Sequence, residues 1–377
     1  MGSGALFSIY IGEKSTEKLK STIGQAFTLI AAVTAVLNVL LYAFIDPILS
    51  FLQIPETLYA DMREYLIIIF AGIAATFLYN FFACLLRAAG NSASPLIFLA
   101  VSALLNIALD LWFVLGLNFG IAGAAAATVI SQYVSGIGLL LFTIFREKKL
   151  LPERKHFKPN RKILRELFDL SFLTCAQQSA MNFGILLIQR LVDGFGPVTM
   201  AAFAAAVKID TFAYLPVQDF GNAFSTFAAQ NYGAKQSKRL KKGMRTAVLV
   251  SVIFSAIISV AVIVFAEPLM KIFISEKETA VIAEGIRYLR IEGAFYIGIG
   301  CLFLLYGFYR AVKRPGMSLV LTIVSLGTRV LLAYLSAPYF GEPGVWVSVP
   351  IGWALADIIG FAYYFKNKKK LLPQNNS

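Results

Sequence analysis

Two acidic residues, Asp210 and Asp219, stand inside one long apolar run of the sequence, where a charged side chain is costly to bury. Lys208 lies close by, and Pro216 between the two acids would interrupt the hydrogen bonds of a helix. An acid beside such a break could attract a cation. Alternatively, Lys208 could neutralise one acid across a helix interface, and the residues alone leave both interpretations open.

Other apolar runs contain further polar candidates. Glu292 is either a cation-binding or protonatable group, or the partner of Lys208 or Arg190. Asp110 follows Asn106 by four residues, which places both on one helix face, and it is the main candidate of the first half. The remaining candidates form a polar stripe that either lines a cavity or bonds neighbouring helices: Gln177, Gln178 and Asn182.

Arg329 and Asp357 are ionisable residues near the middle of two consecutive apolar runs. Because neighbouring helices run in opposite directions, we expect the two side chains at similar depth in a membrane. They would form either a gating ion pair or a structural pair that joins two helices. We favour the structural pair, because the corresponding positions of the first half, Asn106 and Gly136, could not form an ion pair.

The composition defines the elements that must position these residues. Of 377 residues, 58% are hydrophobic and only 15% are charged, with a mean hydropathy of +0.72. Soluble proteins are about 45–50% apolar and about 25% charged. The composition therefore excludes a soluble enzyme, a disordered chain and a coiled coil, and it indicates an all-α polytopic membrane protein.

Ten segments have the length of about 20 mostly apolar residues that a membrane-spanning helix needs. An eleventh, Gly2–Ile11, has half that length. The ten predicted spans are Gln25–Ile45, Tyr65–Leu86, Leu96–Leu117, Ile121–Phe145, Leu167–Val192, Val198–Ala229, Met244–Ala266, Ile286–Phe308, Met317–Tyr339 and Val345–Phe365.

The basic residues are distributed unevenly between the connecting loops. The net charge is +13, and 26 of the 34 Lys and Arg residues fall on one side of the predicted spans. Cytoplasmic loops carry such an excess, so we expect the basic loops and the C-terminus in the cytoplasm. The charge thus records topology in a cell inner (plasma) membrane, and nucleic acid is not an expected partner.

The sequence contains an internal repeat with a spacing of 221–223 residues. The matched positions are Ile11-Gly12 with Tyr232-Gly233, Asp46-Pro47 with Glu267-Pro268, Tyr65-Leu66 with Tyr288-Leu289, Arg87 with Arg310, and Gly120 with Gly341. Since Arg87 and Arg310 both fall in basic loops, the repeats have the same orientation and are parallel.

The repeat predicts the domain organisation. We expect an N-terminal lobe over 1–145, a basic cytoplasmic linker over 146–165, a C-terminal six-helix lobe over 166–365 and a cytoplasmic tail over 366–377. The segment Glu166–Asn222 has no counterpart in the first half. We therefore expect the first lobe to lack about 57 residues at its N-terminus, leaving ten full spans and a partial one.

Several short motifs resemble the MATE (multidrug and toxic compound extrusion) family. They are the segment Gln230-Asn231-Tyr232-Gly233-Ala234, Phe195-Gly196 before the run Ala201–Ala206, the twin helix ends at Arg87 and Arg310, and Pro350-Ile351-Gly352-Trp353 leading to Asp357. The resemblance extends over nearly the whole chain.

The resemblance implies two six-helix lobes around a central cavity that opens alternately to each side of the membrane. It further implies export of organic, often cationic, compounds in exchange for Na⁺ or H⁺, with no cofactor. Substrates would be attracted by aromatic walls and by acids among Asp210, Asp219, Glu292 and Asp357. We expect a monomer in the lipid bilayer.

Three other classes are disfavoured. A membrane enzyme would need clustered metal or catalytic ligands, whereas the only histidine, His156, falls in a basic loop that we expect to be solvated. A channel usually surrounds one axis with identical subunits, whereas this chain carries its duplication internally. The closest alternative is a flippase of lipid-linked oligosaccharides, which would favour a cavity rich in basic residues.

Overall fold

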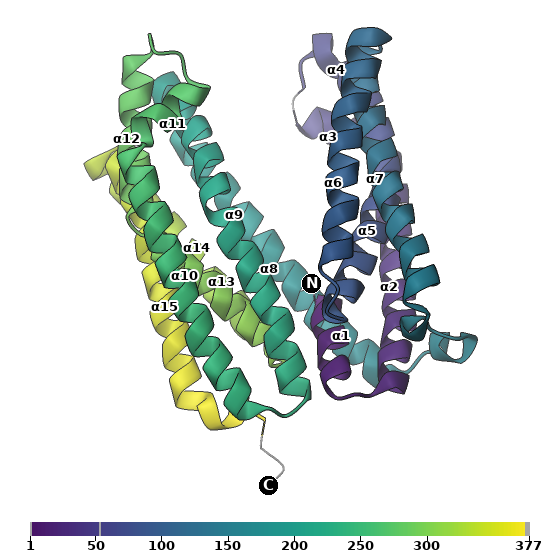
Figure 1. The fold of residues 1–377 in the computed structure, drawn as a ribbon. Helices are drawn as coiled ribbons and strands as arrows, with labels where there is room; N and C mark the ends of the chain where they lie inside the picture. Colours follow the sequence, from purple (N-terminus) through teal and green to yellow (C-terminus); the bar gives the residue numbers. More distant parts are fainter. Residues whose placement is uncertain (1, 53, 374–377) are drawn as a thin grey trace. The chain divides into compact units, whose positions relative to one another are not determined.

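The computed structural model describes residues 2–52 and 54–373, and within these ranges the regular structure is entirely helical (Figure 1). The chain forms two compact units. The first unit contains Ser15–Leu167, and the second contains Met1–Lys14 together with Phe168–Ser377.

The first unit consists of α-helices, a π-helix and two short 3₁₀ turns. The α-helices that lie wholly within it are α2 (Thr16–Ala43), α3 (Ile45–Phe51), α4 (Glu56–Ala71), α5 (Ile73–Ala88), α6 (Ala93–Asp110) and α7 (Gly120–Arg146). The π-helix, Leu111–Gly116, directly follows α6, and the 3₁₀ turns are Lys148–Leu150 and Arg154–Phe157.

The second unit begins with the short helix α1 (Gly2–Gly12) and continues from α8 (Arg161–Asp193) onward. Its other helices are α9 (Pro197–Gly233), α10 (Ser237–Val264), α11 (Ala266–Phe273), α12 (Thr279–Gly293), α13 (Tyr296–Ala311), α14 (Pro315–Phe340) and α15 (Glu342–Leu371).

The helices confirm a multi-pass membrane protein. In the described residues, eight helical segments are long and apolar enough to cross a membrane, and a ninth is obtained if α12 and α13, bent by 52°, form one span. These nine correspond to nine of the ten predicted spans. The tenth, Leu167–Val192, lies in α8, which is long enough but is not among the sufficiently apolar helices, because Gln177, Gln178 and Asn182 lower its hydropathy.

The repeat is visible in the helix boundaries. The bounds of α10 follow those of α2 by 221 residues at both ends, and the short helix α11 begins 221 residues after α3. The break between α4 and α5 at Gly72 has its counterpart between α12 and α13. Positive backbone φ angles recur in three pairs: Lys14 with Lys235, Gly90 with Lys313, and Gly120 with Gly341.

Helix α1 falls in a different unit from α2, although the two helices are consecutive in the chain. Its residues belong to the second unit, where α1 packs mainly against α9. Gly12 and Gly233 permit this packing, because each lies directly against the backbone of the other helix. A side chain at either position would separate the two helices.

The core of the second unit is rich in aromatic side chains. The Trp346 ring stacks on Phe203 with centroids 5.4 Å apart and meets Tyr288 edge-on at 4.9 Å. The indole nitrogen of Trp346 donates a hydrogen bond of 2.8 Å to Glu284. This cluster fixes α9, α12 and α15 against one another.

The 3₁₀ turn Arg154–Phe157 of the basic linker packs against α2. His156 is only 2% exposed, which corrects our expectation for this residue. Its Nδ1 accepts the backbone N–H of Glu153 at 2.9 Å, and its Nε2 lies 3.1 Å from the Glu17 carboxylate. Lys20 pairs with Glu153 at 2.9 Å, and this hydrogen bond holds the pKa of the Glu153 carboxyl below its usual range.

Candidate functional site

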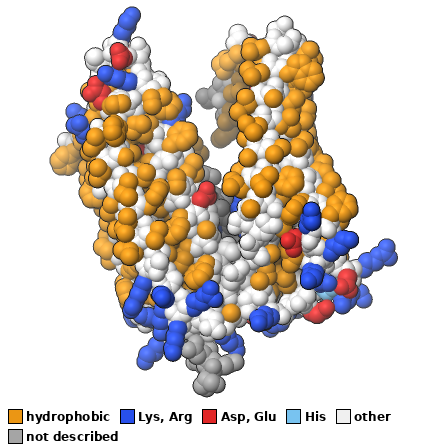
Figure 2. Space-filling view, in the orientation of Figure 1, with side chains coloured by type: hydrophobic (Ala, Val, Ile, Leu, Met, Phe, Trp, Pro, Cys, Tyr) orange, Lys and Arg blue, Asp and Glu red, His pale blue; other side chains and the backbone are white. Residues whose placement is uncertain are grey.

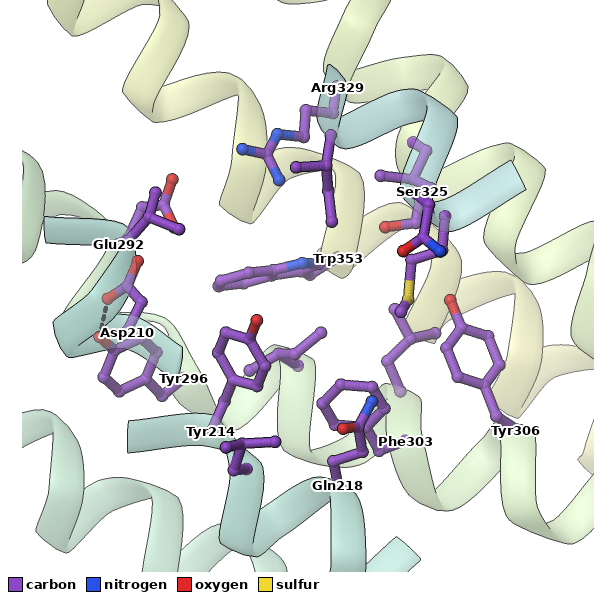
Figure 3. Close-up of a pocket in the computed structure, with 18 of the residues that line it drawn as sticks. Asp210, Tyr214, Gln218, Glu292, Tyr296, Phe303, Tyr306, Ser325, Arg329 and Trp353 are labelled. Atoms are coloured by element: carbon purple, nitrogen blue, oxygen red, sulfur yellow. Dashed lines mark hydrogen bonds between the residues drawn. The ribbon is translucent and has the colours of Figure 1, made fainter. Parts of the chain in front are cut away.

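A cavity of about 240 Å³ lies inside the second unit, between helices α8, α9, α12, α13, α14 and α15 (Figure 3). It is lined by aromatic rings together with a few polar groups, a composition typical of sites that bind small organic molecules.

Two acids meet at one wall of this cavity. Asp210 and Glu292 are each 3% exposed and lie close together in Figure 3. The hydroxyl group of Tyr296 donates a hydrogen bond to the Asp210 carboxylate. The interruption of the helix between α12 and α13 explains this arrangement, because it places Glu292 near the end of one helix and Tyr296 at the start of the next.

Arg329 of α14 faces the same cavity and is the basic residue among its lining side chains. It attracts the carboxylates of Asp210 and Glu292 electrostatically. Neither Nε of Arg329 nor Oε1 of Glu292 has a hydrogen-bond partner among the described residues. Burying ionised groups without full pairing costs several kcal/mol, so the two acids require further neutralisation beyond one arginine, either by a proton or by a cation.

The remaining wall is aromatic. The Trp353 ring lies between Arg329 and Tyr214 in Figure 3, and Phe303 and Tyr306 close the other side. Such rings bind the apolar part of an organic molecule, and their faces attract cations. The cavity therefore combines acidic groups for charge with an aromatic surface for shape.

The structure brings together some of the predicted site residues and separates others. Asp210, Glu292 and Asn182 line the cavity, whereas Gln178 is half-buried on α8 outside the lining. Asp219 is exposed and does not line it. Asp219 lies nine positions after Asp210, which is two and a half turns of an ideal helix. The spacing alone therefore places the two acids on opposite faces of the helix.

Asp110 lies in the other unit, at the last residue of α6 and directly before the π-helix. Its Oδ1 atom is buried and has no hydrogen-bond partner among the described residues. The neighbouring amide of Asn106 donates a weak hydrogen bond of 3.4 Å to Thr128.

The expected pairing of Arg329 with Asp357 is not formed, although both helices pack closely. Gly352 of α15 lies against Ser325 and the Cβ of Arg329, so Arg329 is level with Gly352 rather than Asp357. Asp357 is five residues further on, about 7.5 Å along the helix and on a different face, near Gly298 of α13. Its Oδ1 has no partner in the described part of the chain.

Lys208 does not neutralise an acid of the site either, which corrects the alternative that we considered. It is exposed, and its ammonium group lies 5.7 Å from the centre of the Phe273 ring. Arg190 is likewise exposed on α8 and does not line the cavity.

Sequence reasoning missed the contribution of Trp353 and Tyr288 to the lining and that of Arg329 to the acidic pair. Trp353 belongs to the motif Pro350–Trp353, which we used only as a sign of family resemblance. Tyr288 directly follows a basic residue, and nothing in its local sequence indicates a cavity.

Apolar spans around a cavity that combines acidic groups with aromatic rings are typical of a membrane transporter. The chain belongs to the MatE family, whose profile matches residues 1–112 and 173–335.

Known proteins of this family resemble the chain over nearly its full length. It is 28% identical over 384 residues to the probable multidrug resistance protein YoeA of Bacillus subtilis, covering 99% of this chain and 82% of that protein. It is 23% identical over 380 residues to the probable multidrug resistance protein NorM of Thermotoga maritima, covering 99% and 79%. The crystal structure of the MATE transporter VcmN of Vibrio cholerae in the bent form superimposes with a TM-score of 0.89 at 22% identity, covering 98% and 84%.

Proposed function

We propose that this chain is a secondary antiporter that exports organic, often cationic, compounds in exchange for H⁺ or Na⁺. The observation that carries the proposal is the cavity in which Asp210 and Glu292 face Arg329 among aromatic rings. The similarity to probable multidrug resistance proteins supports the same substrate class.

The acids of the cavity provide a physical basis for exchange. Asp210 accepts a hydrogen bond from Tyr296, whereas Oε1 of Glu292 is unpartnered among the described residues and can take up a proton or contact a cation. A substrate cation and the coupling ion would compete for the same negative charge. Binding of one would favour release of the other, and a ligand that binds two conformations with different affinity shifts their populations.

Alternating access requires the two repeats to act as lobes. In this proposal, residues 1–145 and 166–365 form the two lobes, with the 146–165 linker, the basic loops and the 366–377 tail in the cytoplasm. The protein would act as a monomer in the cell inner (plasma) membrane. Of the other predicted site residues, Asp110, Gln178 and Asp357 would contribute to ion or substrate binding in other conformations. Asp219, which is exposed on α9, would not take part in transport.

Transport by reconstituted protein tests the proposal. Purified protein in liposomes should export ethidium when a H⁺ gradient or a Na⁺ gradient is imposed, and the gradient that supports efflux identifies the coupling ion. The variant Glu292→Gln should lose gradient-driven efflux and retain its melting temperature. Absence of efflux of any organic cation under either gradient would contradict the antiporter.

A lipid-linked oligosaccharide flippase is the second candidate, and the cavity argues against it. Recognition of a pyrophosphate would need several basic groups, whereas the described lining contains Arg329 and two acids. Flipping of a fluorescent lipid pyrophosphate without any ion gradient, by protein that does not move ethidium, would favour this alternative.

A further inference from the structure

A group of basic residues lies at one end of the second unit, where α10 begins and α15 ends (Figures 1 and 2). The Ser237 hydroxyl donates a hydrogen bond to the Pro373 carbonyl, which joins the two helix ends. We call this surface the basic end; it consists of Lys238, Arg239, Lys241, Lys242 and Arg245 of α10 and Lys366, Lys368, Lys369 and Lys370 of α15.

The described part of the chain leaves the charge of the basic end unpaired. None of its nine residues forms an ion pair within residues 2–52 and 54–373. The equivalent helix of the other repeat differs, because Lys20 of α2 is paired with Glu153 at 2.9 Å and an acid, Glu17, stands where α10 has Lys238. The second repeat therefore concentrates positive charge where the first compensates it.

One face of α10 continues from this charge into an apolar surface. Lys241 and Arg245 are exposed, and the positions at the same four-residue spacing are Leu249, Ile253 and Ile257, exposed by 60%, 51% and 61%. Residues four apart are neighbours on the helix surface. Because each step of four residues turns by about 40°, these five residues form a row that winds gradually around α10, and we use the term face for this row. The face thus presents two cations and then about 12 Å of apolar side chains from Leu249 to Ile257, at 1.5 Å per residue.

We infer that this face of α10 binds an anionic glycerophospholipid. The phosphate group lies between Lys241 and Arg245, and the acyl chains extend along Leu249, Ile253 and Ile257. A free phosphate ion would use only the basic half of the face, whereas the continuous apolar half matches a lipid. Basic side chains at the membrane surface attract anionic headgroups.

Lipid retention by the full-length chain tests this inference. The protein is exchanged into mixed micelles containing equal amounts of phosphatidylglycerol and phosphatidylcholine, and the bound lipids are counted by native mass spectrometry. The wild type should retain phosphatidylglycerol preferentially. The double variant K241Q/R245Q should lower that preference by about tenfold or more, and the charge-conserving variant K241R/R245K should keep it.

A matched control removes the same charge elsewhere. Lys148 and Lys149 are exposed lysines of the linker, and K148Q/K149Q should retain phosphatidylglycerol as the wild type does. Equal melting temperatures of the variants in phosphatidylcholine alone would show that the fold is intact. An unchanged lipid preference of K241Q/R245Q would overturn the inference, as would complete displacement of phosphatidylglycerol by inorganic phosphate at equal concentration, which would indicate a site for the anion alone.

Discussion

Gly12 and Gly233, which occupy equivalent positions in the two repeats, each lie against the backbone of the other's helix. A Cβ atom on Gly12 would stand 2.0 Å from the carbonyl oxygen of Gln230, and a Cβ on Gly233 would stand 2.0 Å from that of Ile9. Ile9 and Gln230 are also separated by the repeat spacing, so the contact is reciprocal, as in an isologous interface. Helices α1 and α9 therefore cross on a local pseudo-twofold axis.

Substitution of either glycine should destabilise this crossing. We expect Gly12→Ala and Gly233→Ala to lower stability by about 1–3 kcal/mol each, because a methyl group must displace backbone atoms. Gly327 of α14 is the control, since a Cβ there meets nothing within 4 Å. Gly327→Ala should be neutral or stabilising by up to about 1 kcal/mol. Thermal unfolding in detergent measures all three, and equal melting temperatures would refute the close crossing.

The two acids of α9 should differ in their importance for transport. Asp210→Asn removes one of the two buried carboxylates of the cavity, which accepts a hydrogen bond from Tyr296 and is attracted by Arg329. The cavity then has less negative charge with which to bind a cation or a proton. We expect gradient-driven ethidium efflux to fall by more than about tenfold. Asp219→Asn, on the exposed face of the same helix, should leave efflux close to wild type. The reverse order of effects would exclude the cavity as the coupling site.

Arg329 should be coupled energetically to Glu292 and not to Asp357. Double-mutant cycles with Arg329→Gln, Glu292→Gln and Asp357→Asn measure the interaction energies through thermal unfolding. We expect a coupling of about 0.5–3 kcal/mol for the pair that shares the cavity, and less than about 0.5 kcal/mol for Arg329 with Asp357. A strong coupling between Arg329 and Asp357 would contradict this prediction. It would support the structural ion pair that we expected from their similar depth in the membrane.

The buried histidine should protect the linker from proteolysis. His156→Ala leaves the Glu153 N–H without its acceptor and removes the contact with Glu17. We expect trypsin to cleave after Arg154 and Lys155 several times faster in this variant. Cleavage after Lys148 and Lys149, which belong to the other 3₁₀ turn of the linker, should be unchanged and serves as the internal reference. Equal cleavage at all four sites would show that the turn does not depend on His156.

The ion pair between Asp46 and Arg63, at 2.9 Å, predicts a pH dependence at the short helix α3. The Arg63 guanidinium, followed by the Tyr59 hydroxyl, holds the pKa of the Asp46 carboxyl below its ordinary value of 3.8. A carboxyl group with a lowered pKa in the folded state stabilises the fold above 3.8, and this stabilisation disappears as the pH falls through the folded-state pKa.

The melting temperature of wild type should therefore exceed that of Asp46→Asn at pH 6, and the difference should shrink as the pH falls below 3.8. The size of the difference is small, because both partners are exposed to solvent. A difference that stays constant across this pH range would exclude the ion pair as its source. Because the wild type and Asp46→Asn are compared in the same detergent, the contribution of the other titrating groups cancels.

Much of the fold could be predicted from the sequence because a membrane imposes a simple requirement on each span. Apolar length identified nine of the spans found in the structure, and the residue spacing of the repeat reappears in the bounds of α2 and α10. The exception, α8, carries a polar stripe that a helix can bury against its neighbours. Such burial depends on packing and cannot be read from hydropathy alone.

The candidate site could be predicted only in part. Asp210 and Glu292 were recognisable because an acid within an apolar run requires an explanation. Their shared cavity was not recognisable, because it depends on the 52° bend between α12 and α13. The expected pairing of Arg329 with Asp357 was wrong for a similar reason. Similar depth in the membrane does not determine which faces of two neighbouring helices are in contact.

The sequence by itself determined that the protein spans a membrane, that it is built from a repeat, and that a few polar residues must be buried among apolar ones. These properties follow from composition and periodicity, which act residue by residue. The tertiary structure alone decided which of these polar groups meet. Asp210, Glu292 and Arg329 share one cavity, whereas Asp357 faces Gly298, because helix rotation and bending are set by the packing of side chains from distant parts of the chain.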